Sequence, residues 1–183
     1  MEIILAENHG FCYGVKRAVE MANEAANGKG KSYTLGPIIH NPQVVGRLES
    51  KGVSPIQEVS DIDEGTMIIR SHGVGPAIYE EAEEKGLAIV DATCPHVKKA
   101  QQDAKSVIED GMTLVILGEK NHPEVKSINL WANNKGIIIE DEDSAKNLQV
   151  VEKMGVVVQT TFSQFKFNSI IEILEKKSKN LKI

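Results

Sequence analysis

The sequence has little of what marks several large protein classes. It contains only two cysteines, one tryptophan, three tyrosines and four phenylalanines in 183 residues. No apolar run is long enough to cross a membrane, and no charged-then-apolar leader with a small-residue cleavage site is present. We therefore expect a cytoplasmic protein that is neither inserted into a membrane nor secreted.

Positive charge is also scarce. Lysine and arginine together number 21 against 26 aspartates and glutamates, which gives a formal net charge of −5 at pH 7. A nucleic-acid surface needs a basic stripe or stacking aromatic residues. The composition therefore predicts no nucleic-acid partner, and any anionic ligand must be bound by local groups.

The two cysteines leave three possibilities open in a reducing compartment, namely metal binding, catalysis and core packing. No C-x-x-C or H-x-x-x-H pair occurs, which argues against a local zinc site. Isolated thiolates on separate loops suit an iron–sulfur cluster held between lobes, because soft sulfur ligands select such clusters. Two thiolates are too few for a complete site, and the chain contains no third cysteine.

What the sequence does contain is a regular alternation of apolar runs and amphipathic stretches. The runs predict strands at "EIILA", "SYTLG", "TMIIR", "LAIVDA", "MTLVILG", "GIIIE" and "VGVVVQ", and the stretches predict helices over 15–27, 41–50, 76–85, 97–110 and 163–180. Such repeated βα units indicate an α/β fold with parallel sheets and flanking helices. We predict two lobes, residues 1–93 and 94–183.

Polar residues follow the predicted strands at their C-terminal ends. They are Cys12, His40, His72, Cys94, His122, Glu124 and Thr160, whereas His9 lies in the first such loop without an evident partner. Ligands of open parallel sheets bind in the crevice outside these strand ends, where helix N-termini present free N–H groups. These residues are therefore the candidates for a functional site.

Each candidate also has a structural interpretation. A single cysteine is often a small buried hydrophobic residue, and His72 in "SHGVG" could be an ordinary turn residue. His122 and Glu124 in "NHPEV" could simply begin a helix. The glycines on both sides of Cys12 and beside His72 favour a functional interpretation, because they allow close backbone approach and an anion-binding nest.

Six segments taken together resemble the 4-hydroxy-3-methylbut-2-enyl diphosphate reductase (LytB-type) family, which performs the last step of non-mevalonate isoprenoid synthesis. They are "GFCYGVKRAVE", "GPIIHNPQVV", "RSHGVG", "VDATCPHV", "NHPEV" and "QTTFS". The resemblance implies a three-lobe architecture around a central 4Fe-4S cluster. The chain resembles the first two lobes, with residues 1–13 assigned to the first lobe or to the missing third one.

The resemblance also implies residue roles. Cys12 and Cys94 would be cluster ligands, with the third cysteine absent from this chain. His40, His72 and His122 would bind the substrate diphosphate, as protonated imidazoles that supply local positive charge, and Thr160 would contact the substrate hydroxyl. Glu124 would deliver the proton that lets water leave.

The implied reaction is a two-electron reductive dehydroxylation of 4-hydroxy-3-methylbut-2-enyl diphosphate to isopentenyl and dimethylallyl diphosphates. Electrons would come from an external donor of ferredoxin or flavodoxin type, and we expect the 183-residue chain to be inactive by itself. Two other interpretations remain open. One is a Cys–His nucleophilic enzyme, and the other is a non-catalytic binding module that has lost the cluster.

Overall fold

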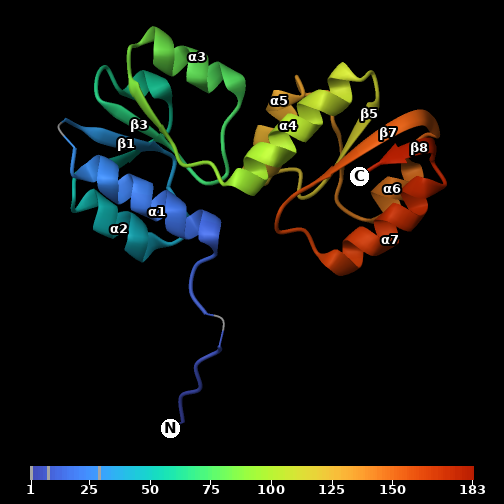
Figure 1. The fold of residues 1–183 in the computed structure, drawn as a ribbon, viewed down its shortest axis with the longest axis horizontal. Coiled ribbons are helices and arrows are strands. Elements are labelled where there is room, and N and C mark those ends of the chain that lie inside the picture. The colour runs from blue at the N-terminus through green and yellow to red at the C-terminus, as the bar shows by residue number, and fades with distance from the viewer. Residues whose placement is uncertain (1, 8, 29) are drawn as a thin grey trace.

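The fold consists of two parallel sheets, each flanked by helices, that lie side by side (Figure 1). A computed structural model describes residues 2–7, 9–28 and 30–183. The predicted α/β class is confirmed. Each sheet has four strands, and the two sheets share one topology, because their strand orders are β2-β1-β3-β4 and β6-β5-β7-β8.

The strands are short, and the central ones, β1, β3, β5 and the second half of β7, are the most buried. In the first sheet they are β1 (Ser32–Leu35), β2 (Val53–Ile56), β3 (Thr66–Ile69) and β4 (Ala88–Asp91). In the second they are β5 (Thr113–Leu117), β6 (Ile137–Ile139), β7 (Val151–Val158) and β8 (Ser178–Lys182). Burial on both faces explains why the central strands read as continuous apolar runs rather than alternating ones.

Helices cover both faces of each sheet. The helices are α1 (Tyr13–Ala26), α2 (Pro42–Glu49), α3 (Pro76–Glu84), α4 (Pro95–Glu109), α5 (Pro123–Trp131), α6 (Glu142–Asn147) and α7 (Gln164–Glu175), with a 3₁₀ turn η1 at Val59–Asp61. One apolar core lies between the first sheet and α1–α2, and another between that sheet and α3. The second sheet is packed in the same way by α4–α5 and by α6–α7.

Prolines mark several helix starts, as the sequence suggested. Pro76 and Pro95 occupy the first turns of α3 and α4, where a missing backbone N–H is tolerated. None of the helices in the described residues is both long enough and apolar enough to cross a bilayer. The division near residue 93 remains a prediction.

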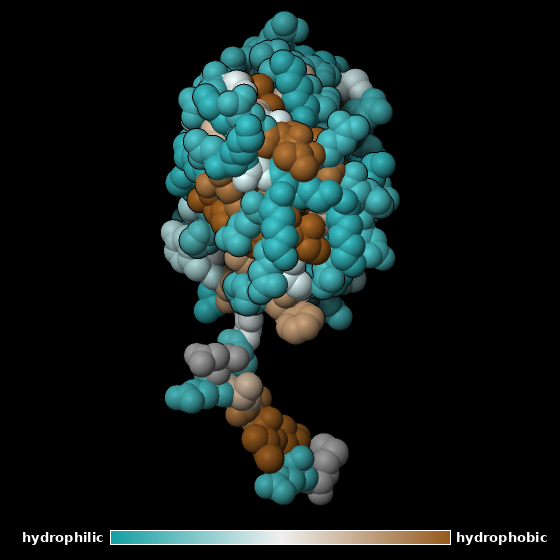
Figure 2. Space-filling view, turned by 90° about the vertical axis from the view of Figure 1, so that its right-hand side faces the viewer, coloured by the Kyte–Doolittle hydropathy of each residue, from teal (hydrophilic) through white to brown (hydrophobic). Residues whose placement is uncertain are grey.

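The strand predicted at "EIILA" is wrong. The described residues 2–7 form no strand, and the side chains of Ile3, Ile4 and Leu5 are exposed. Figures 1 and 2 show this N-terminal segment extending away from the body of the protein, with apolar surface along it. A segment with high strand propensity forms a strand only where a neighbouring strand can share backbone hydrogen bonds with it.

The helix predicted over 163–180 is too long. Helix α7 ends at Glu175, and the chain then pairs as β8 with β7, for example Met154 with Leu181. Strand β2 was also missed, because it is short and contains Pro55, which is tolerated there since β2 is an edge strand.

The two lobes are joined by specific contacts from α5. The indole Nε1 of Trp131 donates a hydrogen bond of 2.9 Å to the carbonyl of Val74 in the first lobe. Nearby, Gln101 Nε2 donates to Ser127 Oγ at 2.6 Å, and a Cβ at Gly73 would lie 2.4 Å from that same Nε2. The loop that carries His72 therefore rests directly on α4 and α5.

Candidate functional site

The candidate residues lie at the topological switch point of each sheet. Strands β1 and β3 are neighbours, yet they lead to α2 and α3 on opposite faces of the first sheet. His40 follows β1, and His72 follows β3. In the second sheet, His122 follows β5 and Thr160 follows β7 in the same manner. Crevices at such switch points are where open parallel sheets bind ligands.

Three imidazoles form a row across the junction of the lobes. The ring centroids of His40 and His72 are 4.9 Å apart, and those of His72 and His122 are 5.4 Å apart. The first two come from the first lobe and the third from the second lobe. The sequence placed these histidines after strands, and the tertiary structure places them next to one another.

His122 has a defined hydrogen-bond orientation. It is the N-cap of α5, and its Nδ1 accepts from the backbone N–H of Glu124 at 3.2 Å. In a neutral imidazole one nitrogen accepts and the other carries the proton. Nε2 is therefore the protonated nitrogen of neutral His122 and remains a donor for a ligand.

His72, at the centre of the row, is half-buried. Its Nδ1 is buried and has no hydrogen-bond partner among the described residues. Burial, followed by the charge of Arg70 and of the imidazoles of His40 and His122, lowers the pKa of His72 to about 4. The expectation of a protonated imidazole is therefore wrong for His72 in the free protein at neutral pH. An anion beside the ring would act in the opposite direction.

Glu124 is almost completely buried, with 2% of its surface exposed. Its Oε1 accepts from the backbone N–H of Thr160 at 2.6 Å, and its Oε2 accepts from the Thr160 hydroxyl at 2.9 Å. Thr160 itself is exposed. The hydroxyl of Thr160 is thus the solvent-facing end of a two-residue pair that connects α5 with the segment after β7.

Both cysteines lie at helix starts. Cys12 is the N-cap of α1 and Cys94 the N-cap of α4, and both thiols are free. A Cβ at Gly14 would lie 2.6 Å from the sulfur of Cys94, which shows how closely the start of α1 approaches this residue. The Cys94 N–H also donates to the carbonyl of Ser71, next to His72, at 2.9 Å.

The two thiols are accessible at least in part. Cys12 is exposed and Cys94 half-buried, so neither is enclosed in the interior of a lobe. Within residues 2–7, 9–28 and 30–183, no group of three or more His, Cys, Asp or Glu side chains is arranged to hold a metal ion. The chain therefore offers two soft ligands, which is fewer than an iron–sulfur cluster requires.

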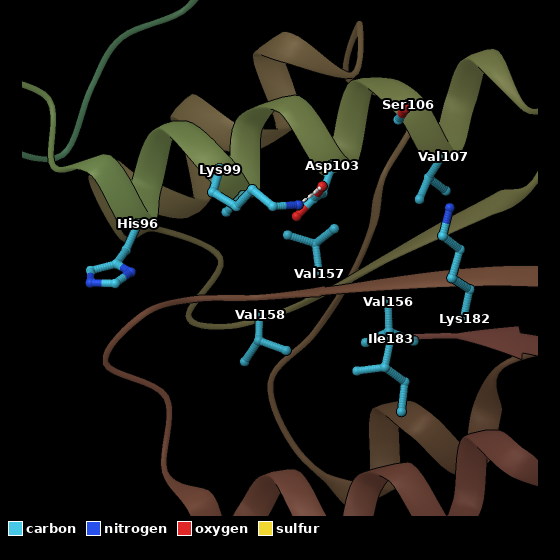
Figure 3. Close-up of a pocket in the computed structure, with 11 residues that line it drawn as sticks. His96, Lys99, Asp103, Ser106, Val107, Val156, Val157, Val158, Lys182 and Ile183 are labelled. Carbon is cyan, nitrogen blue, oxygen red and sulfur yellow. Dashed lines mark hydrogen bonds and ion pairs between the residues drawn. The ribbon is translucent and has the colours of Figure 1, made fainter.

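A cavity of about 360 Å³ lies elsewhere, between α4 and the strands β7 and β8 (Figure 3). Val156, Val157 and Val158 line one side of it, and Lys99 forms an ion pair with Asp103 on the other. None of the predicted site residues lines this cavity. This cavity is therefore separate from the histidine row, which is the candidate functional site.

Sequence analysis missed Arg70. It lies two residues before His72, at the end of β3, and contributes to the low pKa of that histidine. Its position directly after an apolar run was the available signal. The same signal had identified Cys12 and Cys94.

Comparison with known proteins gives consistent results over nearly the whole chain. The model of the LytB protein family matches residues 3–183. The chain is 47% identical over 183 residues to the 4-hydroxy-3-methylbut-2-enyl diphosphate reductase of Geotalea uraniireducens, covering 100% of this chain and 65% of that protein. It is 50% identical over 163 residues to that of Geobacter sulfurreducens, covering 89% of this chain and 58% of that protein.

Two solved structures share the fold. The E-1-hydroxy-2-methyl-but-2-enyl-4-diphosphate reductase from Plasmodium falciparum superposes with a TM-score of 0.88 at 32% identity, over 93% of this chain and 55% of that one. An (E)-4-hydroxy-3-methyl-but-2-enyl diphosphate reductase, described as the terminal enzyme of the non-mevalonate pathway, gives 0.83 at 42% identity, over 98% and 66%. The chain thus spans somewhat less than two thirds of these relatives' length.

Proposed function

Because the chain belongs to the LytB protein family, we propose that it forms part of a 4-hydroxy-3-methylbut-2-enyl diphosphate reductase. The reaction is a reductive dehydroxylation. The allylic C–O bond breaks, two electrons and two protons are taken up, and water leaves with isopentenyl or dimethylallyl diphosphate as product. The observation that supports this proposal best is the row of three imidazoles across the lobe junction.

In this proposal the histidine row binds the substrate diphosphate. His122 offers its Nε2–H, since its Nδ1 is already an acceptor. His40 is exposed and reachable, and His72 lies between the two other rings. The N-terminus of α5 adds the positive end of its dipole. The site thus concentrates positive potential locally in a protein whose net charge is −5.

Glu124 and Thr160 handle the proton in this proposal. When Glu124 is protonated, the Thr160 hydroxyl turns toward the substrate and accepts from the Glu124 carboxyl, and the proton of Glu124 passes to Thr160 as Thr160 gives its own proton to the departing hydroxyl. The hydrogen bond of 2.9 Å between Thr160 Oγ1 and Glu124 Oε2 is short enough for this exchange. The second hydrogen bond, from the Thr160 N–H, fixes the orientation of the carboxyl group.

Cys12 and Cys94 would hold two positions of a 4Fe-4S cluster, completed by ligands outside this chain. When bound, the cluster supplies electrons from an external donor of ferredoxin or flavodoxin type and a Lewis-acidic iron for the substrate hydroxyl. The close approach of Gly14 to the sulfur of Cys94 supports this assignment. The nucleophilic alternative has no comparable support, because no hydrogen bond among the described residues joins either thiol to a histidine.

Substrate binding can be tested on the 183-residue chain by titration calorimetry. We expect binding of 4-hydroxy-3-methylbut-2-enyl diphosphate, weakened by about 10-fold or more in His40→Asn and in His122→Asn, because each loses a hydrogen bond to a charged group. His96→Asn is the matched control, since His96 lines the separate cavity on α4. If His40→Asn and His122→Asn bound the substrate as tightly as His96→Asn does, the result would contradict a diphosphate site at the histidine row.

Activity requires a longer protein. We suggest joining the chain to the part of the Geotalea uraniireducens relative that it does not cover, and reconstituting the product with iron and sulfide without oxygen. Formation of isopentenyl and dimethylallyl diphosphates with a reduced one-electron mediator would support the proposal. A loaded chimaera that releases neither product would refute it.

A further inference from the structure

Two cavities occupy equivalent places in the two lobes. One, of about 330 Å³, lies at the carboxyl end of the first sheet, and its lining also includes residues from the loop before α5 and from α5 itself. The other, of about 420 Å³, lies at the carboxyl end of the second sheet. We name them the first-lobe cavity and the second-lobe cavity.

Strand register establishes the equivalence. Leu35 at the end of β1 pairs with Ile56, and Leu117 at the end of β5 pairs with Ile139. The residues that follow the two edge strands are therefore equivalent, Gln57 in the first lobe and Glu140 in the second. By the same register Arg70, just after β3, corresponds to Gln159, just after β7.

The equivalent cavities have opposite charge. The second-lobe cavity is lined by Glu119, Glu140 and Asp141, against one cation, Lys166. Among the described residues that line the first-lobe cavity, two are cationic, Arg70 and Lys126, and none is acidic. In a chain of net charge −5, a cavity with cations and no acid is unlike its surroundings.

Arg70 lacks an acceptor. Its side chain is half-buried, its Nε is buried without a hydrogen-bond partner, and it takes part in no ion pair of the described residues. The equivalent Gln159 is satisfied, because its Oε1 accepts from the Glu119 N–H at 2.9 Å and its Nε2 donates to Thr161 at 2.8 Å. A guanidinium this buried is normally paired.

The rest of the first-lobe cavity is amphiphilic. Asn121 and Ser127 contribute polar groups near α5, while Leu35, Ile78 and Leu130 provide an apolar wall. None of His40, His72 and His122 lines it, although its lining residues Gly73, Asn121 and Pro123 are their neighbours in the sequence. Arginine and lysine together, beside apolar surface, match a phosphate group that carries a short hydrocarbon.

We propose that the first-lobe cavity is a second anion site, in which Arg70 and Lys126 bind the phosphate group of a small organic phosphate. The hydrocarbon part of the ligand packs against the apolar wall. The Arg70 guanidinium then gains the acceptor that none of the described residues provides. This site does not depend on the reaction proposed above.

Titration of the 183-residue chain with n-pentyl phosphate tests the site. Arg70→Gln is the chosen variant, because glutamine is the residue that the second lobe carries at the equivalent position. We expect Arg70→Gln to weaken binding by about 10-fold or more, since a charge-assisted and partly bidentate contact is lost. Lys126→Gln, at an exposed position on α5 that tolerates substitution, should weaken it less but measurably.

Two controls separate this site from others. Lys166→Gln removes a charge of the same kind from the second-lobe cavity and should leave the affinity unchanged. His40→Asn impairs the histidine row, which could also take the probe, and in this variant binding that Arg70→Gln weakens should persist. In the His40→Asn background, binding that Arg70→Gln and Lys126→Gln leave unchanged, or no binding at all, would overturn the proposal. Thermal unfolding of each variant verifies that it is folded.

Discussion

Gly14 lies directly against the sulfur of Cys94, so closely that a Cβ at residue 14 would come within 2.6 Å of Sγ. Gly14 is in the first turn of α1, two residues after the N-cap Cys12, and Cys94 is the N-cap of α4. Arg17 adds a second connection, because its guanidinium donates to the carbonyl of Thr93 at 3.1 Å. The starts of α1 and α4 are thus held together without a covalent bond.

Substituting Gly14 tests this contact. Gly14→Ala should destabilise the protein by about 1–3 kcal/mol and shift the Cys94 thiol, because the added methyl group overlaps the sulfur. Gly46→Ala is the control, since a Cβ there meets nothing within 4 Å. Because alanine favours the helical conformation of α2, this variant should raise the free energy of unfolding by roughly 0.5–1 kcal/mol. Chemical denaturation measures both changes. A Gly14→Ala variant as stable as Gly46→Ala would show that the sulfur moves aside freely.

Glu124→Gln should abolish proton delivery while preserving the fold. The amide oxygen can still accept from the Thr160 N–H, and the amide N–H₂ can donate to the Thr160 hydroxyl after that hydroxyl rotates. In the complete, cluster-loaded chimaera we expect kcat to fall about 10²–10⁴-fold with little change in substrate affinity. Steady-state kinetics under anaerobic conditions provide the measurement.

His122→Asn provides the contrast to Glu124→Gln. It should raise KM more than it lowers kcat, because it removes a diphosphate donor that is two residues from Glu124 and leaves the carboxyl pair intact. Near-full turnover of Glu124→Gln at saturating substrate, with matched iron content, would show that the proton comes from elsewhere.

Stability should depend on pH through His72. Its pKa is about 4 in the folded protein against an ordinary value of 6.5, so between these values the unfolded chain binds the proton and the folded one does not. The free energy of unfolding should therefore decrease as pH falls from about 6.5 to about 4, by roughly 1–2 kcal/mol after allowance for partial solvent exposure. The loss should be smaller in His72→Asn.

Ligand binding should reverse this shift. A diphosphate beside His72 favours the charged ring, so binding near pH 5–6 should be accompanied by proton uptake. Calorimetry in two buffers of different ionisation enthalpy would detect it. Identical apparent enthalpies in both buffers, for the parent and for His72→Asn, would argue that the ring does not contact the anion.

Iron binding by this chain should be weak. Reconstitution of the 183-residue chain with iron and sulfide should give iron that a chelator removes quickly, because two thiolates leave most of a 4Fe-4S cluster accessible. Cys12→Ser and Cys94→Ser should each reduce the bound iron further. A stable, stoichiometric cluster absorption in the monomer would contradict the incomplete ligand set.

The sequence by itself determined the class of fold and the candidate residues. Alternating apolar runs and amphipathic helices predicted parallel α/β units, because a strand buried on both faces reads as a nearly continuous apolar run, as β3 and β5 do after their first threonine. Polar residues after such runs, including His72 and Glu124, had to emerge at the carboxyl edge. Local pattern is sufficient for these inferences since each depends on the chain's own periodicity.

Only the tertiary structure decided which residues meet. The distance of 5.4 Å between the rings of His72 and His122 depends on the packing of α5 against the loop that contains Val74, a contact 57 residues apart in sequence. The absence of a strand at residues 2–7 and the unsatisfied Arg70 have the same origin. A strand requires a neighbouring strand, and a buried cation requires an acceptor. Long-range packing decides whether these partners are present, and local periodicity does not encode it.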